Sequence, residues 1–164
     1  MATLLELCAK GDLIKLEVPL EPNEMPHRRL FATPEFVKWL EDGLPQIKFD
    51  EIYSDLSPLE QVSVLFSDYL TGVEFSDDRR FKPLKWTPDL GIWELKTDDV
   101  RIFGWIPDKD AFVCCFGDSA DQIKLLDLYG RYITKTSFTM NSMDLNAPKH
   151  VDGKEYSDVL SNQY

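Results

Sequence analysis

The hydrophobic positions in the first half of the chain recur with the period of a helix, most clearly in residues 58–71. Those positions are Leu59, Val62, Phe66, Tyr69 and Leu70. Ser57 and Glu60 have the spacing of a capping box, and Pro58 suits the first helical position. Gly72 follows the last hydrophobic position and can end the helix. We therefore predict a helix over residues 58–71.

A second helix is predicted just upstream, near residues 34–42. Thr33 can cap its N-terminus, and Pro34 fits its first position, where a backbone N–H is not needed. Gly43 and Pro45 end it. The connection between the two helices is short, so we expect an antiparallel helical hairpin.

In the second half the pattern changes to short runs of β-branched and aromatic residues. The runs are residues 92–96, 100–106 and 111–116, with polar turns at 97–99 and 107–110 between them. This spacing predicts a meander of three antiparallel strands.

The N-terminal region carries a weaker signal. Alternating hydrophobic positions in residues 5–8 and 13–18, on either side of Gly11, favour a hairpin. A short amphipathic helix over residues 3–10 is the alternative. Residues 28–32 then form a short strand candidate that leads into the first helix.

After the meander, Ser119 and Gln122 have capping-box spacing and predict a helix that runs through Ile123 and Leu126. From residue 146 onward the chain is polar and aperiodic, which predicts a loosely ordered tail.

This order of elements predicts one α+β domain over residues 1–145, followed by the polar tail 146–164. We expect an antiparallel sheet with the helical hairpin packed on one face and an added N-terminal hairpin. The chain has 164 residues, of which 43% are hydrophobic, and this suits a single core.

Composition narrows the class of protein. No apolar run approaches the roughly 20 residues of a membrane helix, because charged residues interrupt each run. The N-terminus has no basic leader and carries Glu6 within its apolar stretch, so we expect no secretory signal and a cytoplasmic protein. The three cysteines (Cys8, Cys114 and Cys115) and two histidines suit neither a disulfide framework nor a metal site. No cofactor-binding motif is present in the sequence.

The net charge is −11, and it is unevenly distributed. Residues 1–78 carry 6 basic and 16 acidic side chains, whereas residues 79–109 carry 7 basic and 5 acidic ones. The acidic half is expected to repel nucleic acid and to attract a basic partner through the outer face of the helical hairpin. The residues predicted to bind that partner are Glu35, Glu41, Asp42 and Asp68. The alternative is that the acidity serves only solubility.

The middle segment contains a basic stretch with interleaved aromatic residues. Its cations are Arg79, Arg80, Lys82 and Lys85. Phosphate contacts from these cations and stacking on Phe81 and Trp86 would suit RNA binding. A charged linker whose aromatic residues enter the core is the alternative.

The element order, together with the sequences Trp93-Glu94-Leu95-Lys96 and Val100-Arg101-Ile102, resembles the RelE/ParE toxin superfamily. The Glu-Leu-basic form is most similar to its HigB-like and phage-derived branch. The resemblance covers roughly residues 28–133 and implies a helical hairpin, a linker and two motif-bearing strands.

The resemblance also implies a function. Such toxins cleave messenger RNA on the ribosome without a metal, using Lys and Arg around the scissile phosphate, and a partner antitoxin silences them. Arg101 matches the arginine of the second strand motif. On this basis Arg101, Lys96 and Tyr129 are the predicted catalytic residues, with help from Lys82 and Lys85.

Some family positions lack the expected cation. Ile92 and Glu94 stand where relatives place lysines on the first motif strand, and residues 116–121 contain no Lys or Arg. Arg101 and Lys96 are then alternatively ordinary surface charges paired with nearby aspartates, among them Asp118. The second hypothesis is therefore a non-catalytic, phage-type protein-binding or anti-defence factor on the same fold.

Overall fold

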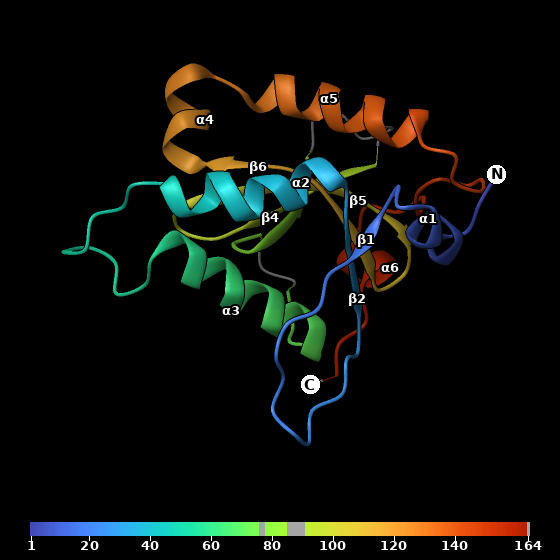
Figure 1. The fold of residues 1–164 in the computed structure, drawn as a ribbon, viewed down its shortest axis with the longest axis horizontal. Coiled ribbons are helices and arrows are strands. Elements are labelled where there is room, and N and C mark those ends of the chain that lie inside the picture. Colours follow the sequence, from blue (N-terminus) through green and yellow to red (C-terminus); the bar gives the residue numbers. More distant parts are fainter. Residues whose placement is uncertain (76–77, 85–90, 164) are drawn as a thin grey trace.

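A mixed six-stranded sheet forms the centre of the computed structural model, which describes residues 1–75, 78–84 and 91–163 (Figure 1). In spatial order the strands are β1 (Ile14–Lys15), β2 (Arg29–Ala32), β6 (Ala111–Ser119), β5 (Val100–Asp108), β4 (Ile92–Lys96) and β3 (Phe81–Pro83). An α+β class is therefore correct.

The predicted meander is confirmed, because β4, β5 and β6 are consecutive antiparallel neighbours. The expectation of a wholly antiparallel sheet is wrong, since β2 runs parallel to β6. A hairpin turn forces antiparallel pairing, but no such turn joins β2 to β6. The chain leaves β2 through two helices and reaches the opposite edge of the sheet before the meander begins.

The helical hairpin forms where the caps predicted it. In α2 (Pro34–Lys38) the Thr33 hydroxyl accepts a hydrogen bond from the Phe36 N–H at 3.2 Å, and a π-helical turn (Trp39–Gly43) and a 3₁₀ turn (Leu44–Gln46) continue the coil. The longer α3 (Pro58–Thr71) begins with a complete Ser57–Glu60 capping box and ends at Gly72, whose φ is +89°.

Helices cover both faces of the sheet: the helical hairpin packs on one face, as predicted, and two later helices cover the other face. In Figure 1, α4 (Ala120–Leu126) and α5 (Tyr129–Ser142) lie above the strands and α3 lies below them. Trp93 and Leu95 of β4 face the α2–α3 core, whereas Phe103 and Trp105 of β5 face the core beneath α5. The central strands are buried on both sides, which explains their nearly continuous hydrophobic runs.

The N-terminus is a helix, which was the alternative to the predicted hairpin. In α1 (Leu4–Lys10) the Thr3 hydroxyl accepts from the Glu6 N–H at 3.1 Å, and Gly11 closes the helix in the left-handed region. Strand β1 pairs with β2 rather than with residues 5–8. Local capping thus decides this segment in favour of the helix.

The C-terminal segment is packed, although its composition predicted a loose tail. Its short helix α6 (Tyr156–Val159) buries Val159 and Leu160 in the core shared with α3. The Ser161 carbonyl accepts two hydrogen bonds from the Arg28 guanidinium, at 2.8 and 3.0 Å. Val151 and Tyr156 also pack against this core, and the Ser161 N–H and hydroxyl donate to the Asp110 carboxylate. These distant contacts hold a segment that is otherwise polar. Over the described residues, no helix is long and apolar enough to cross a membrane.

Candidate functional site

Ionisable side chains gather on the α5 face of the sheet, close to the edge formed by β3. Lys82 on β3 is the register partner of Glu94 on β4, and Lys96 on β4 is opposite Arg101 on β5. Paired residues on adjacent strands share a face, so all four lie on the side covered by α5. Tyr129, the first residue of α5, packs edge-on against Phe103 at a centroid distance of 5.6 Å. We call Lys82, Glu94, Lys96, Arg101 and Tyr129 the β3–β5 cluster.

Glu94 is the buried acid of this cluster, with 0% of its surface exposed. Among the described residues, no donor meets hydrogen-bond geometry with either of its carboxylate oxygens. Burial raises the pKa of Glu94, and the nearby Tyr129 hydroxyl opposes that rise most, followed by Lys82, Arg101 and Lys96. A buried carboxyl of this kind calls for an explanation beyond packing.

Arg101 lies beside this acid but is partly occupied by the backbone. Only 8% of its surface is exposed, and its Nη1 donates to the carbonyls of Thr97 at 2.5 Å and Val100 at 3.0 Å. Its Nε has no acceptor within the described part of the chain. Arg101 thus stabilises the β4–β5 turn through its Nη1, while its Nε donates to no acceptor among the described residues.

The other cations and the tyrosine are half-buried. The Lys96 Nζ donates to the Asp78 carbonyl at 3.3 Å, and burial, followed by repulsion from Lys82, lowers the pKa of Lys96. Burial, and then the neighbouring Glu94 charge, raises the pKa of Tyr129 to about 12. Its hydroxyl therefore remains a protonated donor at neutral pH.

Asp118 is an acidic neighbour in the same row, opposite Arg101 on β6. It accepts hydrogen bonds from the Tyr132 hydroxyl at 2.6 Å and from the Ser119 N–H at 2.7 Å. Across residues 1–75, 78–84 and 91–163, neither Arg101 nor Lys96 forms an ion pair with Asp118. The cations are consequently not neutralised by direct pairing, but an acid remains beside them.

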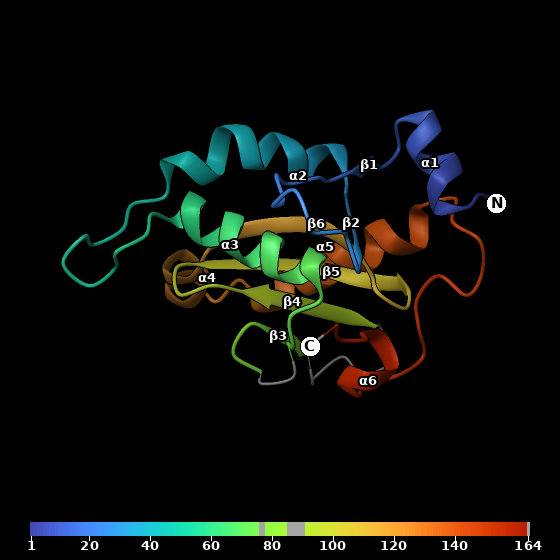
Figure 2. The same cartoon turned by 90° about the horizontal axis from the view of Figure 1, so that it is seen from below.

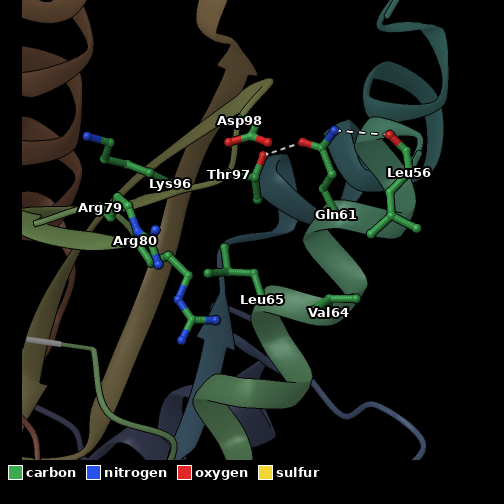
Figure 3. Close-up of a pocket in the computed structure, with 9 residues that line it drawn as sticks. All are labelled: Leu56, Gln61, Val64, Leu65, Arg79, Arg80, Lys96, Thr97 and Asp98. Carbon is green, nitrogen blue, oxygen red and sulfur yellow. Dashed lines mark hydrogen bonds between the residues drawn. The ribbon is translucent and has the colours of Figure 1, made fainter. Parts of the chain in front are cut away.

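The basic stretch predicted to bind RNA is divided between the two faces of the sheet. Lys82 joins the β3–β5 cluster, whereas Arg79 and Arg80 line a pocket of about 270 Å³ between α3 and the β3–β4 edge (Figure 3). The Arg80 Nη1 is 2.8 Å from the Asp68 carboxylate, and its guanidinium lies 4.3 Å from the centroid of the Phe75 ring. Lys85 lies outside the described residues.

Gln61 closes one wall of this pocket and is saturated with hydrogen bonds. Its Nε2 donates to the Leu56 carbonyl at 3.1 Å and to the Asp99 carboxylate at 2.6 Å, while its Oε1 accepts from the Thr97 hydroxyl at 2.8 Å. In Figure 3 the Lys96 side chain points away from Gln61. Gln61 thus joins α3 to the β4–β5 turn. Lys96 lines this pocket and is also a member of the β3–β5 cluster.

The four acids predicted to bind a partner also differ in their surroundings. Glu35, Glu41 and Asp42 are exposed around α2, but Asp68 is engaged by Arg80. In the described residues no group of His, Cys, Asp or Glu side chains could hold a metal ion. All three cysteines are free, and burial raises the pKa of Cys115 to about 12, so this thiol is a poor nucleophile.

The predicted catalytic residues Lys96, Arg101 and Tyr129 lie together in the fold with the predicted helper Lys82. Glu94 was predicted only as a position that lacks the family's lysine. One signal in the sequence could have indicated a buried Glu94. Side chains alternate between the two faces of a strand, so Glu94 lies on the same face as the hydrophobic Ile92.

Comparisons with protein-family models, with curated proteins and with solved structures find no match to this chain.

Proposed function

We propose that the chain is a RelE/HigB-like toxin of the cytoplasm that cleaves messenger RNA without a metal and is held silent by a cognate antitoxin. One observation carries this proposal: three cations, a tyrosine donor and a buried acid converge on one sheet face of a protein with a net charge of −11. A local group of cations in an acidic molecule is suited to recruiting a phosphate to one place.

Each member of the cluster has a chemical role in this proposal. Lys82 and Lys96 bind the phosphate that is attacked by the neighbouring 2′-hydroxyl, and the buried Arg101 guanidinium adds positive charge behind them. Charge builds on the non-bridging oxygens in the transition state, so these cations stabilise it more than the ground state. As the 2′-oxygen bonds to phosphorus it loses its proton to water, the P–O5′ bond breaks and a 2′,3′-cyclic phosphate forms. Tyr129 donates a proton to the leaving 5′-oxygen and is reprotonated by water. Glu94 is too deeply buried to touch RNA. Its carboxyl group lies under the cations and influences the electrostatic potential around them.

A second candidate is a non-catalytic binding protein, and the state of Arg101 favours it. Two of the arginine's hydrogen bonds support the β4–β5 turn, and Asp118 stands in the same row. Both features weaken a phosphate site. In this candidate the exposed acids Glu35, Glu41 and Asp42 attract a basic protein.

Controlled expression in a bacterium separates the two candidates. We expect expression to arrest growth and to produce new messenger RNA 5′ ends, mapped by primer extension. The double change Lys82→Ala and Lys96→Ala should lower cleavage by at least about 100-fold, because each cation is worth about 10-fold or more. Lys124→Ala, which removes an exposed cation of α4, is the matched control and should leave cleavage unchanged.

Purified protein that is treated with EDTA and then desalted, before it meets Mg²⁺-containing ribosomes, should cleave ribosome-bound messenger RNA as well as untreated protein. Growth that continues normally at high expression would contradict the toxin proposal and favour the binding protein. Cleavage abolished by the EDTA treatment of the protein would contradict the metal-independent mechanism.

A further inference from the structure

A loop between the 3₁₀ turn and α3 extends away from the body of the molecule in both views (Figures 1 and 2). Ile52 and Tyr53 stand near its tip with 86% and 87% of their surfaces exposed. Leu56 and Leu59, at the base of the loop and in the first turn of α3, are also exposed. We call Ile52, Tyr53, Leu56 and Leu59 the loop strip. Four exposed, large hydrophobic side chains within eight positions are unusual on a protein surface.

The loop holds this arrangement with its own hydrogen bonds. The Asp50 carboxylate accepts from the Ile52 N–H at 2.9 Å, and the Asp50 carbonyl accepts from the Tyr53 and Ser54 N–H groups, both at 3.1 Å. The Ser54 hydroxyl donates to the Leu56 carbonyl at 2.8 Å. These hydrogen bonds constrain the loop backbone, and the side chains of Ile52 and Tyr53 are exposed on it.

The base of the loop is also anchored to the sheet. Gln61 donates to the Leu56 carbonyl and to the Asp99 carboxylate, so the strip is connected to the β4–β5 turn. A partner that binds a fixed strip loses less conformational entropy than one that must order a free loop. The strip is thus suited to recognition.

The charges around the strip identify the chemistry of its partner. Along the chain, exposed acids stand beside and within the strip, namely Asp50, Glu51, Asp55 and Glu60. At its base, Leu56 shares a pocket with the cations Arg79, Arg80 and Lys96. The nearest basic residue along the chain is Lys48. An apolar strip edged by carboxylates complements a helix with an apolar stripe edged by Lys or Arg.

We propose that the loop strip docks a basic amphipathic helix of a protein partner. A second copy of this chain would bring another acidic strip against the first and be repelled. An anionic membrane surface would repel the same carboxylates. The loop strip contains no residue of the β3–β5 cluster, although its Leu56 and the cluster's Lys96 line the same pocket. The proposal does not depend on whether the chain cleaves RNA.

The test uses a fluorescent synthetic helix of about 18 residues, built from Leu and Lys in an amphipathic pattern, as the probe. A peptide with Glu in place of each Lys is its counterpart. Fluorescence anisotropy should show that the Leu/Lys helix binds the full chain, more weakly as salt rises from about 0.05 to 0.5 M. The Leu/Glu helix should not bind.

A pair of double variants then locates the binding. Ile52→Ser with Tyr53→Ser should raise the Kd for the Leu/Lys helix at least about 10-fold, the effect of losing two apolar anchors. Leu125→Ser with Phe138→Ser is the matched control, because these side chains on α4 and α5 are 76% and 73% exposed. It should leave the Kd within about 2-fold. Because all four positions are exposed, both variants should keep the circular dichroism spectrum of the parent.

Several results would overturn the proposal. Equal loss in both double variants, or no loss in either, would mean that the Leu/Lys helix binds through net charge alone. Binding of the Leu/Glu helix, or no binding of either helix, would contradict the assigned chemistry. Binding to phosphatidylcholine vesicles that depends on Ile52 and Tyr53 would assign the strip to a membrane. A dimer in sedimentation that the same variant abolishes would assign it to a second copy.

Discussion

Among the described residues, the two most deeply buried charged side chains are Arg28 beside β2 and Glu94 on β4, and their surroundings are opposite. Arg28 is 1% exposed, and its guanidinium donates to the carbonyls of Tyr69, Val73 and Ser161 at 2.8–3.1 Å. A fifth bond, at 2.8 Å, reaches the Asn162 side chain. The arginine is thus surrounded by acceptors from α3 and from the C-terminal segment.

Glu94 has the reverse situation, because neither of its oxygens has a well-aligned donor among the described residues. Both groups have pKa values shifted against the charged form by burial. Only Arg28 recovers the lost hydration through hydrogen bonds. A fold tolerates an uncompensated carboxyl mainly where function requires it. Arg28 therefore stabilises the fold, whereas Glu94 belongs to the site of the proposed function.

The largest effect should come from Arg28→Met, which keeps the volume and removes every donor. We expect the free energy of unfolding to fall by about 3–5 kcal/mol, because several buried acceptors lose their partner. Urea denaturation measures the change. Arg29→Met is the control, since Arg29 is partly exposed and pairs with Asp108 at 3.1 Å, and it should lose less than about 1 kcal/mol. If Arg28→Met lowered the free energy of unfolding by less than about 1 kcal/mol, the hydrogen bonds of Arg28 would not stabilise the fold, and the contrast with Glu94 would fail.

The second prediction concerns Glu94→Gln, which keeps the shape and removes the titratable group. Burial raises the folded-state pKa of Glu94, so the parent loses stability as pH rises from the unfolded value of about 4.3 through the folded pKa. The variant should be more stable by about 1–3 kcal/mol at pH 8 and equal to the parent at low pH. Unfolding in urea at both pH values tests this difference.

Glu35→Gln, at an exposed position of α2, is the matched control for this pH dependence. It should change stability by less than about 0.5 kcal/mol at either pH. If Glu94→Gln were instead strongly destabilising at pH 8, Glu94 would be a structural partner of Lys82 and Arg101, and the contrast with Arg28 would fail.

The sequence was most informative where a signal is local. The caps at Thr33 and Ser57 and the glycine at Gly72 place two helices, because each interaction closes within a few residues. The β4–β6 meander follows in the same way from short polar turns. Lys96 and Arg101 were also predictable as neighbours, since a tight turn puts them opposite each other.

The remaining features depend on contacts between distant residues. The parallel pairing of β2 with β6 and the docking of Ser161 on Arg28 join segments about 80 and 130 positions apart. Periodicity carries no information on such pairings. The role of Glu94 was not predictable for a different reason. A charged residue within a hydrophobic strand predicts an unfavourable free energy of burial, but only the fold reveals whether a neighbouring group offsets that free energy.

The smallest predicted effect is that of Tyr129→Phe, which tests the surroundings of Glu94 directly. The Tyr129 hydroxyl, whose own pKa is about 12, favours the ionised carboxylate more than any other neighbour. Its loss should therefore raise the pKa of Glu94 further, which a carbon-13 NMR titration of the carboxyl measures. The stability loss should stay below about 1.5 kcal/mol and be largest above the folded pKa of Glu94, where that carboxyl is ionised.

Tyr132→Phe is the control for this change, because Tyr132 lies on the same helix and stacks on the same Phe103 ring at 5.1 Å. Its hydroxyl donates to Asp118 instead of approaching Glu94. The pKa of Glu94 should therefore stay at its parent value in Tyr132→Phe. If both variants moved it equally, the aromatic packing of α5 would control the acid. If neither moved it, the cations alone would hold Glu94 in place, and Tyr129 would lose its proposed part in proton transfer.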